Sequence, residues 1–566
     1  MKNLKTILSA AIVICIAMLL PASLAAQPTP IIVIGGSSAM FNTLGYAAFE
    51  YSSTLGYNFC GPNHWTYKST TGVAVIHDGR STSIPDENGT IWVSWNGSAD
   101  GVTTPPTRAC AYINLDSTIG VRAAMAVPQA TLGLTVSAGT AGQNKIPGTS
   151  VQDSPIPANV IAALNGQPIG VAAADIRPED AKFATTRALT AQGTNVPLTM
   201  LTYAKGLGYG GAVPGIPAIG YGIESSQSTT IATPVDFALY GTDPITGQTA
   251  WPFYNTISVG AGPVMVFVNT STSATGHLGD SNLTNINTFV LSSVLDGTLS
   301  RTRDLFTNST SLGSYPLKVY IREPLSGTMN TLEWNVTGSY RVLSSQEKGV
   351  TAVSPLPAAQ NPLAQAGTVA GSGRFRVVGT GEMVSTVLAN PDSLGYAFWG
   401  YSNFSKATSG SVARYLTVDG VDPLYSGPAS NPNGVGVFPQ PSAGVYPPIE
   451  FPNIVNGSYP IWTIFRLVVP GTSNFAANYT AATALSEAAQ ADMANKIYDF
   501  VPFTSLNVFR SHFYQQGIGP ENGTRSNGSG GYYPDEGGEV GGAVLPLQAD
   551  YDSITDTGYE IWQKHQ

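Results

Sequence analysis

The sequence predicts an α/β protein with long loop-rich insertions, and three observations support this class. Short apolar strands alternate along the chain with segments of helical spacing, as in sheets flanked by helices. Only 11% of the 566 residues are charged, whereas there are 62 glycines and 40 prolines, a composition that favours turns and long loops. A hydrophobic share of 43% is enough for a large core, which excludes global disorder. The length predicts two or more lobes.

The first expected elements are a buried strand and a helix. Residues 31–34 are a continuous apolar run, the pattern of a parallel strand covered on both faces. A glycine–serine turn follows at 35–38, and apolar residues then recur at helical spacing from Met40 to Tyr51. Further strands are expected at 73–77, 91–95, 111–115, 264–268 and 317–321, and further helices at 159–164, 177–189, 286–295 and 480–498.

Five stretches are rich in glycine, proline, serine and asparagine and have few periodic apolar positions. Such segments are typical of loops or insertions. The stretches are 128–157, 205–234, 354–373, 422–452 and 517–542.

The first 26 residues have the pattern of a cleavable secretory signal peptide. Lys2 and Lys5 precede an apolar run at 7–20, and small residues follow at 21–26. This leader predicts a periplasmic or secreted protein. The formal net charge of −9 argues against a nucleic-acid partner, which requires a basic surface.

Cys60 and Cys110 are the two cysteines outside the leader, since Cys15 lies within its apolar run. In an oxidising compartment an even pair is expected to form one disulfide. Two buried free thiols are the alternative.

The sequence contains no recognisable catalytic or metal-binding motif. The five histidines are scattered, and there is no Gly-x-Ser-x-Gly motif. The acidic run 550–560 does not have EF-hand spacing, and a solvated turn explains it better than calcium binding. We therefore expect no enzyme activity, no metal and no cofactor.

The strongest candidate for a binding site follows the strand expected at 317–321. That strand ends at Arg322, and Ser326, Gly327 and Thr328 stand where a helix should begin. The free N–H groups of a helix N-terminus attract anions, and an arginine adds a two-pronged, charge-assisted hydrogen bond. The alternative is an ordinary helix cap beside a solvent-facing arginine.

This arrangement resembles the anion-binding turn of the phosphate-type periplasmic substrate-binding proteins of ABC importers. That family belongs to the type 2 periplasmic-binding-protein-like superfamily. Other segments resemble that family in the same order along the chain, at 35–40, 172–175, 257–269, 293–298, 379–385, 393–397 and 459–463. The resemblance implies two lobes, each with a mixed sheet flanked by helices, and a ligand cleft between them.

The resemblance also implies which residues bind the ligand. Asp175 would accept the proton of a protonated phosphate and so discriminate against sulfate, which carries no proton at neutral pH. The other implied ligand-binding residues are Ser37, Ser38, Ala39 and Met40, then Ser117 and Thr118 in a second turn, and Arg322, Ser326, Gly327 and Thr328 in lobe two.

Two departures from the family pattern concern the ligand. The family usually has an acid two residues after the arginine, where this chain has Pro324. Its usual Thr-Phe pair in the first turn is replaced by Ala39-Met40 or Met40-Phe41. The chain is also longer than the family's core, mostly between residues 57 and 252.

The sequence therefore predicts a monomeric binding protein that captures phosphate or a related oxyanion for an ABC permease in the inner membrane. The expected boundaries are 1–26 for the signal peptide, 27–261 for lobe one, 262–460 for lobe two, and 461–566 for the return to lobe one and a C-terminal extension. An alternative is a secreted interaction or adhesion protein with long surface loops. A hydrolase with paired carboxylates at Asp175 and Glu179 is a further alternative.

Overall fold

The computed structural model describes the central part of the chain. The described residues are 29–49, 51–52, 57–67, 73–80, 86–143, 153–178, 180–182, 237–239, 241–295, 297–307, 312–322, 325–332, 335–336, 365–366, 370–377, 379–404, 407, 412–442, 445–493, 497–510 and 544–546. The expected signal peptide, the expected loops 205–234 and 517–542, the acidic run 550–560 and most of the expected helix 177–189 lie outside them.

The described residues form strands and helices that alternate along the chain. The strands are β1 (Thr29–Gly36), β2 (Tyr51–Ser52), β3 (Tyr57–Asn58), β4 (Asn63–Tyr67), β5 (Ala74–His77), β6 (Glu87–Asn88), β7 (Thr90–Trp95), β8 (Arg108–Asn114), β9 (Thr131–Leu134), β10 (Val171–Ala174), β11 (Tyr254–Asn269), β12 (Asn285–Ile286), β13 (Lys318–Arg322), β14 (Gln365–Ala366), β15 (Gly373–Val377), β16 (Ser393–Phe398), β17 (Ala413–Val418), β18 (Trp462–Pro470), β19 (Val501–Pro502), β20 (Val508–Arg510) and β21 (Val544–Pro546). The α-helices are α2 (Phe41–Phe49), α3 (Ser117–Met125), α4 (Ala158–Leu164), α7 (Thr288–Leu295), α8 (Gly327–Leu332), α9 (Gly379–Ala389), α11 (Pro452–Val455) and α12 (Phe475–Ala488).

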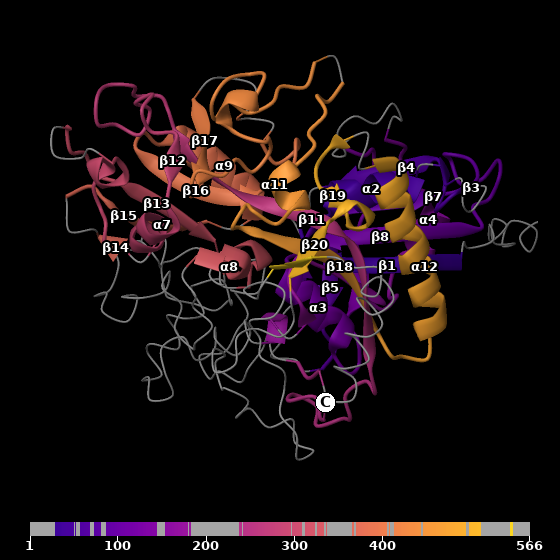
Figure 1. Cartoon of the computed structure of the whole chain (residues 1–566). Helices are drawn as coiled ribbons and strands as arrows, with labels where there is room; N and C mark the ends of the chain where they lie inside the picture. The colour runs from indigo at the N-terminus through magenta and orange to yellow at the C-terminus, as the bar shows by residue number, and fades with distance from the viewer. Residues whose placement is uncertain are drawn as a thin grey trace, which may run out of the picture.

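The protein has the predicted two-lobed α/β fold, and both lobes share one 14-stranded sheet in place of two separate sheets (Figure 1). The main path of the sheet runs β14-β15-β13-β16-β11-β18-β10-β1-β8-β7-β4. In lobe one, β1 is parallel to β8 and β10, and in lobe two, β13 is parallel to β15 and β16.

Strand β11 joins the lobes because its two halves pair with different partners. Its first half is antiparallel to β18, up to the pair Pro263 and Trp462. Its second half pairs with β16, beginning at Val264 and Phe398, and with β17. The long strand therefore runs without interruption from one lobe into the other.

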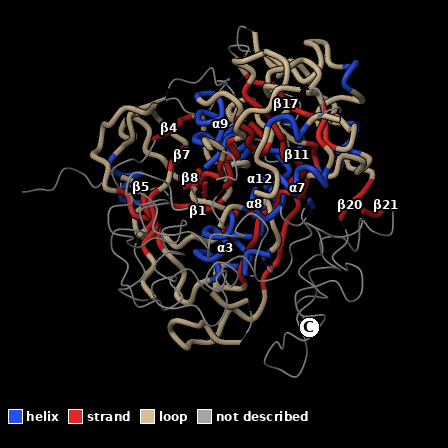
Figure 2. Tube along the Cα trace, turned by 90° about the vertical axis from the view of Figure 1, so that its left-hand side faces the viewer, coloured by secondary structure: helices blue, strands red, loops and turns tan. Residues whose placement is uncertain are grey.

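Helices cover both faces of the lobe-one sheet. Helix α3 packs against β1 and β10, whereas α2 packs against β7, β8 and α12. In lobe two, α9 packs against β13 and β16. Figure 2 shows the strands in the interior, with helices and long loops around them. Among the described helices, none is long and apolar enough to cross a membrane.

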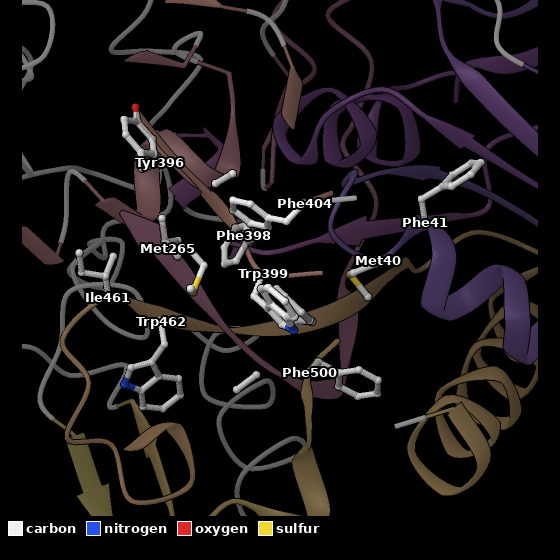
Figure 3. Packing of buried hydrophobic residues seen from close by; sticks show 14 of the residues in the cluster. Met40, Phe41, Met265, Tyr396, Phe398, Trp399, Phe404, Ile461, Trp462 and Phe500 are labelled. Atoms are coloured by element: carbon white, nitrogen blue, oxygen red, sulfur yellow. The ribbon is translucent and has the colours of Figure 1, made fainter. Parts of the chain in front are cut away.

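The core consists of two hydrophobic clusters, one on each face of the lobe-one sheet. Strand β1 contributes to both, because Ile32 and Ile34 point into one cluster and Val33 into the other. The first cluster continues into lobe two, where Trp399 stacks on Phe404 with ring centroids 5.7 Å apart (Figure 3). This shared cluster fixes how the elements that carry the candidate site are placed.

Three details differ from the sequence prediction. A strand, β9, lies inside the expected loop 128–157, and it pairs with β5 through Ala74 and Leu134. The short β14 likewise lies inside the expected loop 354–373. Helix α12 begins at Phe475, five residues earlier than expected, because the Phe475 ring packs edge-on against that of Phe253, with ring centroids 4.8 Å apart. It ends at Ala488 and continues as a π-helical turn.

The predicted disulfide between Cys60 and Cys110 is present. It links two residues 50 positions apart, and the Cys60 N–H also donates a hydrogen bond to the Ala48 carbonyl at 2.7 Å. The bond therefore connects the chain after α2 to strand β8 in the centre of lobe one.

Replacing both cysteines by alanine is expected to lower the free energy of unfolding by about 2–4 kcal/mol, because the closed loop restricts the unfolded chain. Urea unfolding of the two proteins measures this difference. Reductant should destabilise the wild type by a similar amount and leave the double variant unchanged. An unchanged wild-type unfolding curve in reductant would contradict the prediction.

Candidate functional site

Helix α3 places its N-terminus at the carboxyl ends of β1 and β10. Asp116 caps it, with an extended backbone and a carboxylate oxygen 3.0 Å from the Ser117 nitrogen, whose N–H it accepts. Gly120 allows the helix to pack closely, since a Cβ there would lie 2.4 Å from the Gly35 carbonyl oxygen. The first turn of α3 is thus fixed against the sheet.

Asp175 follows β10 directly and faces this helix start. Its side chain is buried, and the Ser117 hydroxyl donates a hydrogen bond to Asp175 Oδ1. The Asp175 N–H in turn donates to Ser117 Oγ at 3.3 Å. Burial raises the pKa of the Asp175 carboxyl, although the Ser117 hydroxyl and the charge of Arg322 oppose that shift. An additional negative charge beside Asp175 is therefore unfavourable in this site.

Arg322 comes from lobe two, at the end of β13, and is completely buried. Its backbone N–H donates to the Tyr396 hydroxyl at 3.1 Å. Its Nη1 donates to the hydroxyls of Thr328 at 3.4 Å and Thr380 at 3.3 Å, and its Nη2 lies 3.3 Å from Asp116 Oδ2. The guanidinium thus connects the starts of α8 and α9 with a carboxylate of lobe one.

Gly327 of lobe two lies close to Asp175. A Cβ on Gly327 would lie 1.6 Å from Asp175 Oδ1 and 2.8 Å from Ser117 Oγ. The start of α8 therefore lies directly on the carboxylate. Ser326 has a local role, because its hydroxyl accepts the Met329 N–H at 3.3 Å and so caps the helix.

The first turn, between β1 and α2, satisfies several of its own polar groups. The Ser37 N–H donates to the Ala173 carbonyl at 2.8 Å, and the Ser37 hydroxyl accepts the Ala39 N–H at 3.1 Å. Ser38 reaches lobe two, with its hydroxyl 3.4 Å from that of Thr380. The Met40 side chain packs in the hydrophobic core (Figure 3).

The structure brings most of the predicted residues together, and the side chains of the others make local contacts. Residues that meet around Asp175 and Arg322 are Ser37, Ser38, Ser117, Gly327 and Thr328. The Thr118 hydroxyl is buried beside Ser117 and has no hydrogen-bond partner among the described residues. Ala39 uses its N–H within the turn, Met40 contributes to the core, and the Ser326 side chain caps α8.

Sequence reasoning missed Asp116, Thr380 and Tyr396 as neighbours of Arg322. Asp116 and Thr380 each stand at a helix start, so a search of the sequence for polar side chains that cap helices could have found them. No local pattern marks Tyr396, because it lies within a buried strand.

Among the residues that the structure describes, the site combines one cation, several hydroxyls and two carboxylates in a buried cluster between the lobes. Such a set can bind an oxyanion that carries at least one proton, since Asp175 can accept a hydrogen bond from an O–H group of the ligand. Among the described residues, no group of three or more His, Cys, Asp or Glu side chains could hold a metal ion.

No protein-family model matches this chain, and no curated protein matches it. Among solved structures, the chain is similar to a phosphate ABC transporter substrate-binding protein with bound phosphate from Clostridium perfringens, at 13% identity and a TM-score of 0.26 over 43% of this chain and 72% of that one. It is similar to a high affinity periplasmic phosphate-binding protein (PfluDING) bound with phosphate, at 13% identity and a TM-score of 0.32 over 83% and 90%. It is also similar to a phosphate-binding protein from Stenotrophomonas maltophilia, at 12% identity and a TM-score of 0.24 over 66% of this chain and 74% of that one. At these TM-scores the overlap is too loose to assign a ligand.

Proposed function

We propose that this protein is a solute-binding protein that captures phosphate or a related tetrahedral oxyanion between its two lobes. This proposal is supported by the observation that Ser117 and Asp175 of lobe one meet Arg322 and Gly327 of lobe two in a buried cluster. These residues are far apart in the sequence and have no common local pattern. Burying a charged and polar cluster is costly unless its members are paired, which favours a binding role.

The delivery step and the lobe boundaries are part of the same proposal. Residues 27–261 and 461–566 would form lobe one and its extension, and 262–460 lobe two, with hinge closure around the ligand. Cleavage after the signal peptide 1–26 would release the protein into the periplasm, where an ABC permease would receive the oxyanion. The role is binding without chemistry. The interaction and hydrolase alternatives have no supporting observation, and Glu179 lies outside the described residues.

Calorimetric titration of the mature protein with phosphate, sulfate and molybdate tests the proposal. We expect phosphate to bind, and we expect Arg322→Ala to lower its affinity at least about tenfold, which corresponds to about 1.4 kcal/mol. The loss follows from the removal of a buried cation that contacts both lobes at the site.

Arg374→Ala is the matched control. Arg374 is also a buried lobe-two arginine, but its Nη1 donates to the Leu295 carbonyl at 3.0 Å, away from the site. Its replacement should leave phosphate affinity within about threefold of wild type. If folded wild-type protein gives no heat with any of the three oxyanions, the proposed function is wrong.

A further inference from the structure

Asp116 makes a second contact that its capping role does not require. A helix cap needs one acceptor, and Asp116 uses one carboxylate oxygen for the Ser117 N–H at 3.0 Å. Its other oxygen lies 3.3 Å from Arg322 Nη2, across the boundary between the lobes. Serine or asparagine would cap the helix equally well without a charge. The position therefore carries a negative charge that directly faces the guanidinium of Arg322.

Within the described part of the chain, five charged or titratable groups around this contact come from five different elements. They are Asp116 before α3, Asp175 after β10, Arg322 at the end of β13, Tyr112 on β8 and Tyr396 on β16. All five side chains are buried. Two carboxylates thus share one guanidinium, in surroundings where burial already raises the pKa of Asp175.

We propose that Asp116 sets the charge of the oxyanion that the site accepts. Because Asp116 neutralises Arg322 from the opposite lobe, the site takes a singly charged, twice-protonated tetrahedral oxyanion such as dihydrogen phosphate in preference to a dianion. This inference rests on the proposed function and names its substrate class.

The hydrogen-bonding capacity of the two carboxylates agrees with this charge argument. Dihydrogen phosphate carries two O–H donors, one for Asp116 and one for Asp175, while its remaining oxygens accept from Arg322 and from hydroxyls such as that of Thr118. A sulfate dianion has no proton to offer and would face both carboxylates with like charge. Arg322 alone cannot offset that repulsion while it is shared with Asp116.

The test compares wild type with Asp116→Asn, with phosphate and sulfate as ligands at about pH 5.5 and about pH 8.5, on either side of the second ionisation of phosphate. Asparagine keeps the acceptor for the Ser117 N–H and nearly the same size, so the helix cap is preserved. Sulfate is a dianion at both pH values. Any pH dependence of sulfate binding therefore comes from the ionisation of protein groups and not from that of the ligand.

We expect wild type to bind phosphate at least about tenfold more tightly at the lower pH, and sulfate weakly at both. In Asp116→Asn, sulfate affinity should rise at least about tenfold. Phosphate affinity at the two pH values should then differ by no more than about threefold. Asp116→Ser, which also caps the helix, should behave like the asparagine variant, and thermal unfolding of each variant establishes that it is folded.

Each other outcome overturns the inference. If both variants bind sulfate no better than wild type, or keep the wild-type phosphate profile, Asp116 does not select the ligand charge, while Arg322-dependent phosphate binding still supports the proposed function. If both folded variants lose phosphate binding, Asp116 positions Arg322 and does not discriminate charge. If wild type binds neither phosphate nor sulfate, this inference is wrong, and the proposed function is wrong as well if molybdate also gives no heat.

Discussion

Alanine at position 327 is expected to lower phosphate affinity by about tenfold to a hundredfold. A Cβ there would lie 1.6 Å from Asp175 Oδ1 and 2.5 Å from Asp175 Cγ. Neither side can yield easily, because Asp175 is fully enclosed and bonded to Ser117, and Gly327 begins α8. Overpacking of this kind costs about 1–3 kcal/mol, and each 1.4 kcal/mol changes a binding constant about tenfold.

Gly381→Ala provides the matched control for this substitution. Gly381 is also near the start of a lobe-two helix, α9, but a Cβ there would meet no atom within 4 Å. Its replacement should leave affinity unchanged. Titration calorimetry gives the affinities, and thermal unfolding shows whether each variant is folded.

A double-variant cycle tests the cause of the Gly327→Ala effect. If the clash with Asp175 is the cause, the stability loss caused by Gly327→Ala should be smaller when Asp175 is already alanine. Additive losses, or wild-type phosphate affinity in Gly327→Ala, would contradict the described contact between α8 and Asp175.

The sequence predicted the elements that depend on local patterns. The strand β1, the helix α2 and the strand β13 all have apolar spacing or turn residues that indicate their type within a short window. Arg322 could be placed because it ends such a strand, whereas the family resemblance placed Asp175. The fold class and the turn that carries Arg322 therefore follow from features that neighbouring residues share.

Contacts between distant residues could not be predicted in this way. Asp116 and Arg322 are 206 positions apart, and nothing in either segment indicates the other. The same holds for a buried ion pair in lobe one, where Arg80 Nη1 lies 2.9 Å from Asp243 Oδ2, 163 positions away. The strand β9 has only four residues, and its pairing with β5 stabilises it more than its own sequence does.

Asp499 lies where α2 of lobe one meets the segment that follows β16 in lobe two. A small cavity there is lined by Asn42, Tyr46, Tyr401, Ser402, Tyr446, Ile497 and Asp499. The Tyr401 N–H donates to Asp499 Oδ1 at 2.8 Å, and the Asn42 amide donates to the Ser402 hydroxyl across the lobes. Burial raises the pKa of Asp499 to about 7, although the Tyr401 N–H opposes the shift. The carboxyl is therefore neutral in the folded protein below that pH.

This shift makes stability depend on pH with a definite sign. The carboxyl pKa is about 3.9 in the unfolded chain and higher in the folded one, so the folded state binds more protons between about pH 4 and pH 7. The contribution of Asp499 is fully present below about pH 4, is lost as the pH rises, and stays lost above about pH 7. Ionised Asp499 destabilises the contact between the lobes at neutral and alkaline pH.

Asp499→Asn is therefore expected to stabilise the protein at about pH 8 by roughly 2–4 kcal/mol, because the amide oxygen still accepts the Tyr401 N–H and carries no charge. Urea unfolding at intervals between about pH 4 and pH 8 measures the effect, and the stability of the variant should decline less than that of wild type across that window. Asp304→Asn, which alters a partly exposed carboxylate, is the control and should keep the wild-type slope. Parallel profiles for wild type and Asp499→Asn would show that Asp499 does not remain protonated at this contact, because only a proton retained by the folded state can produce the difference.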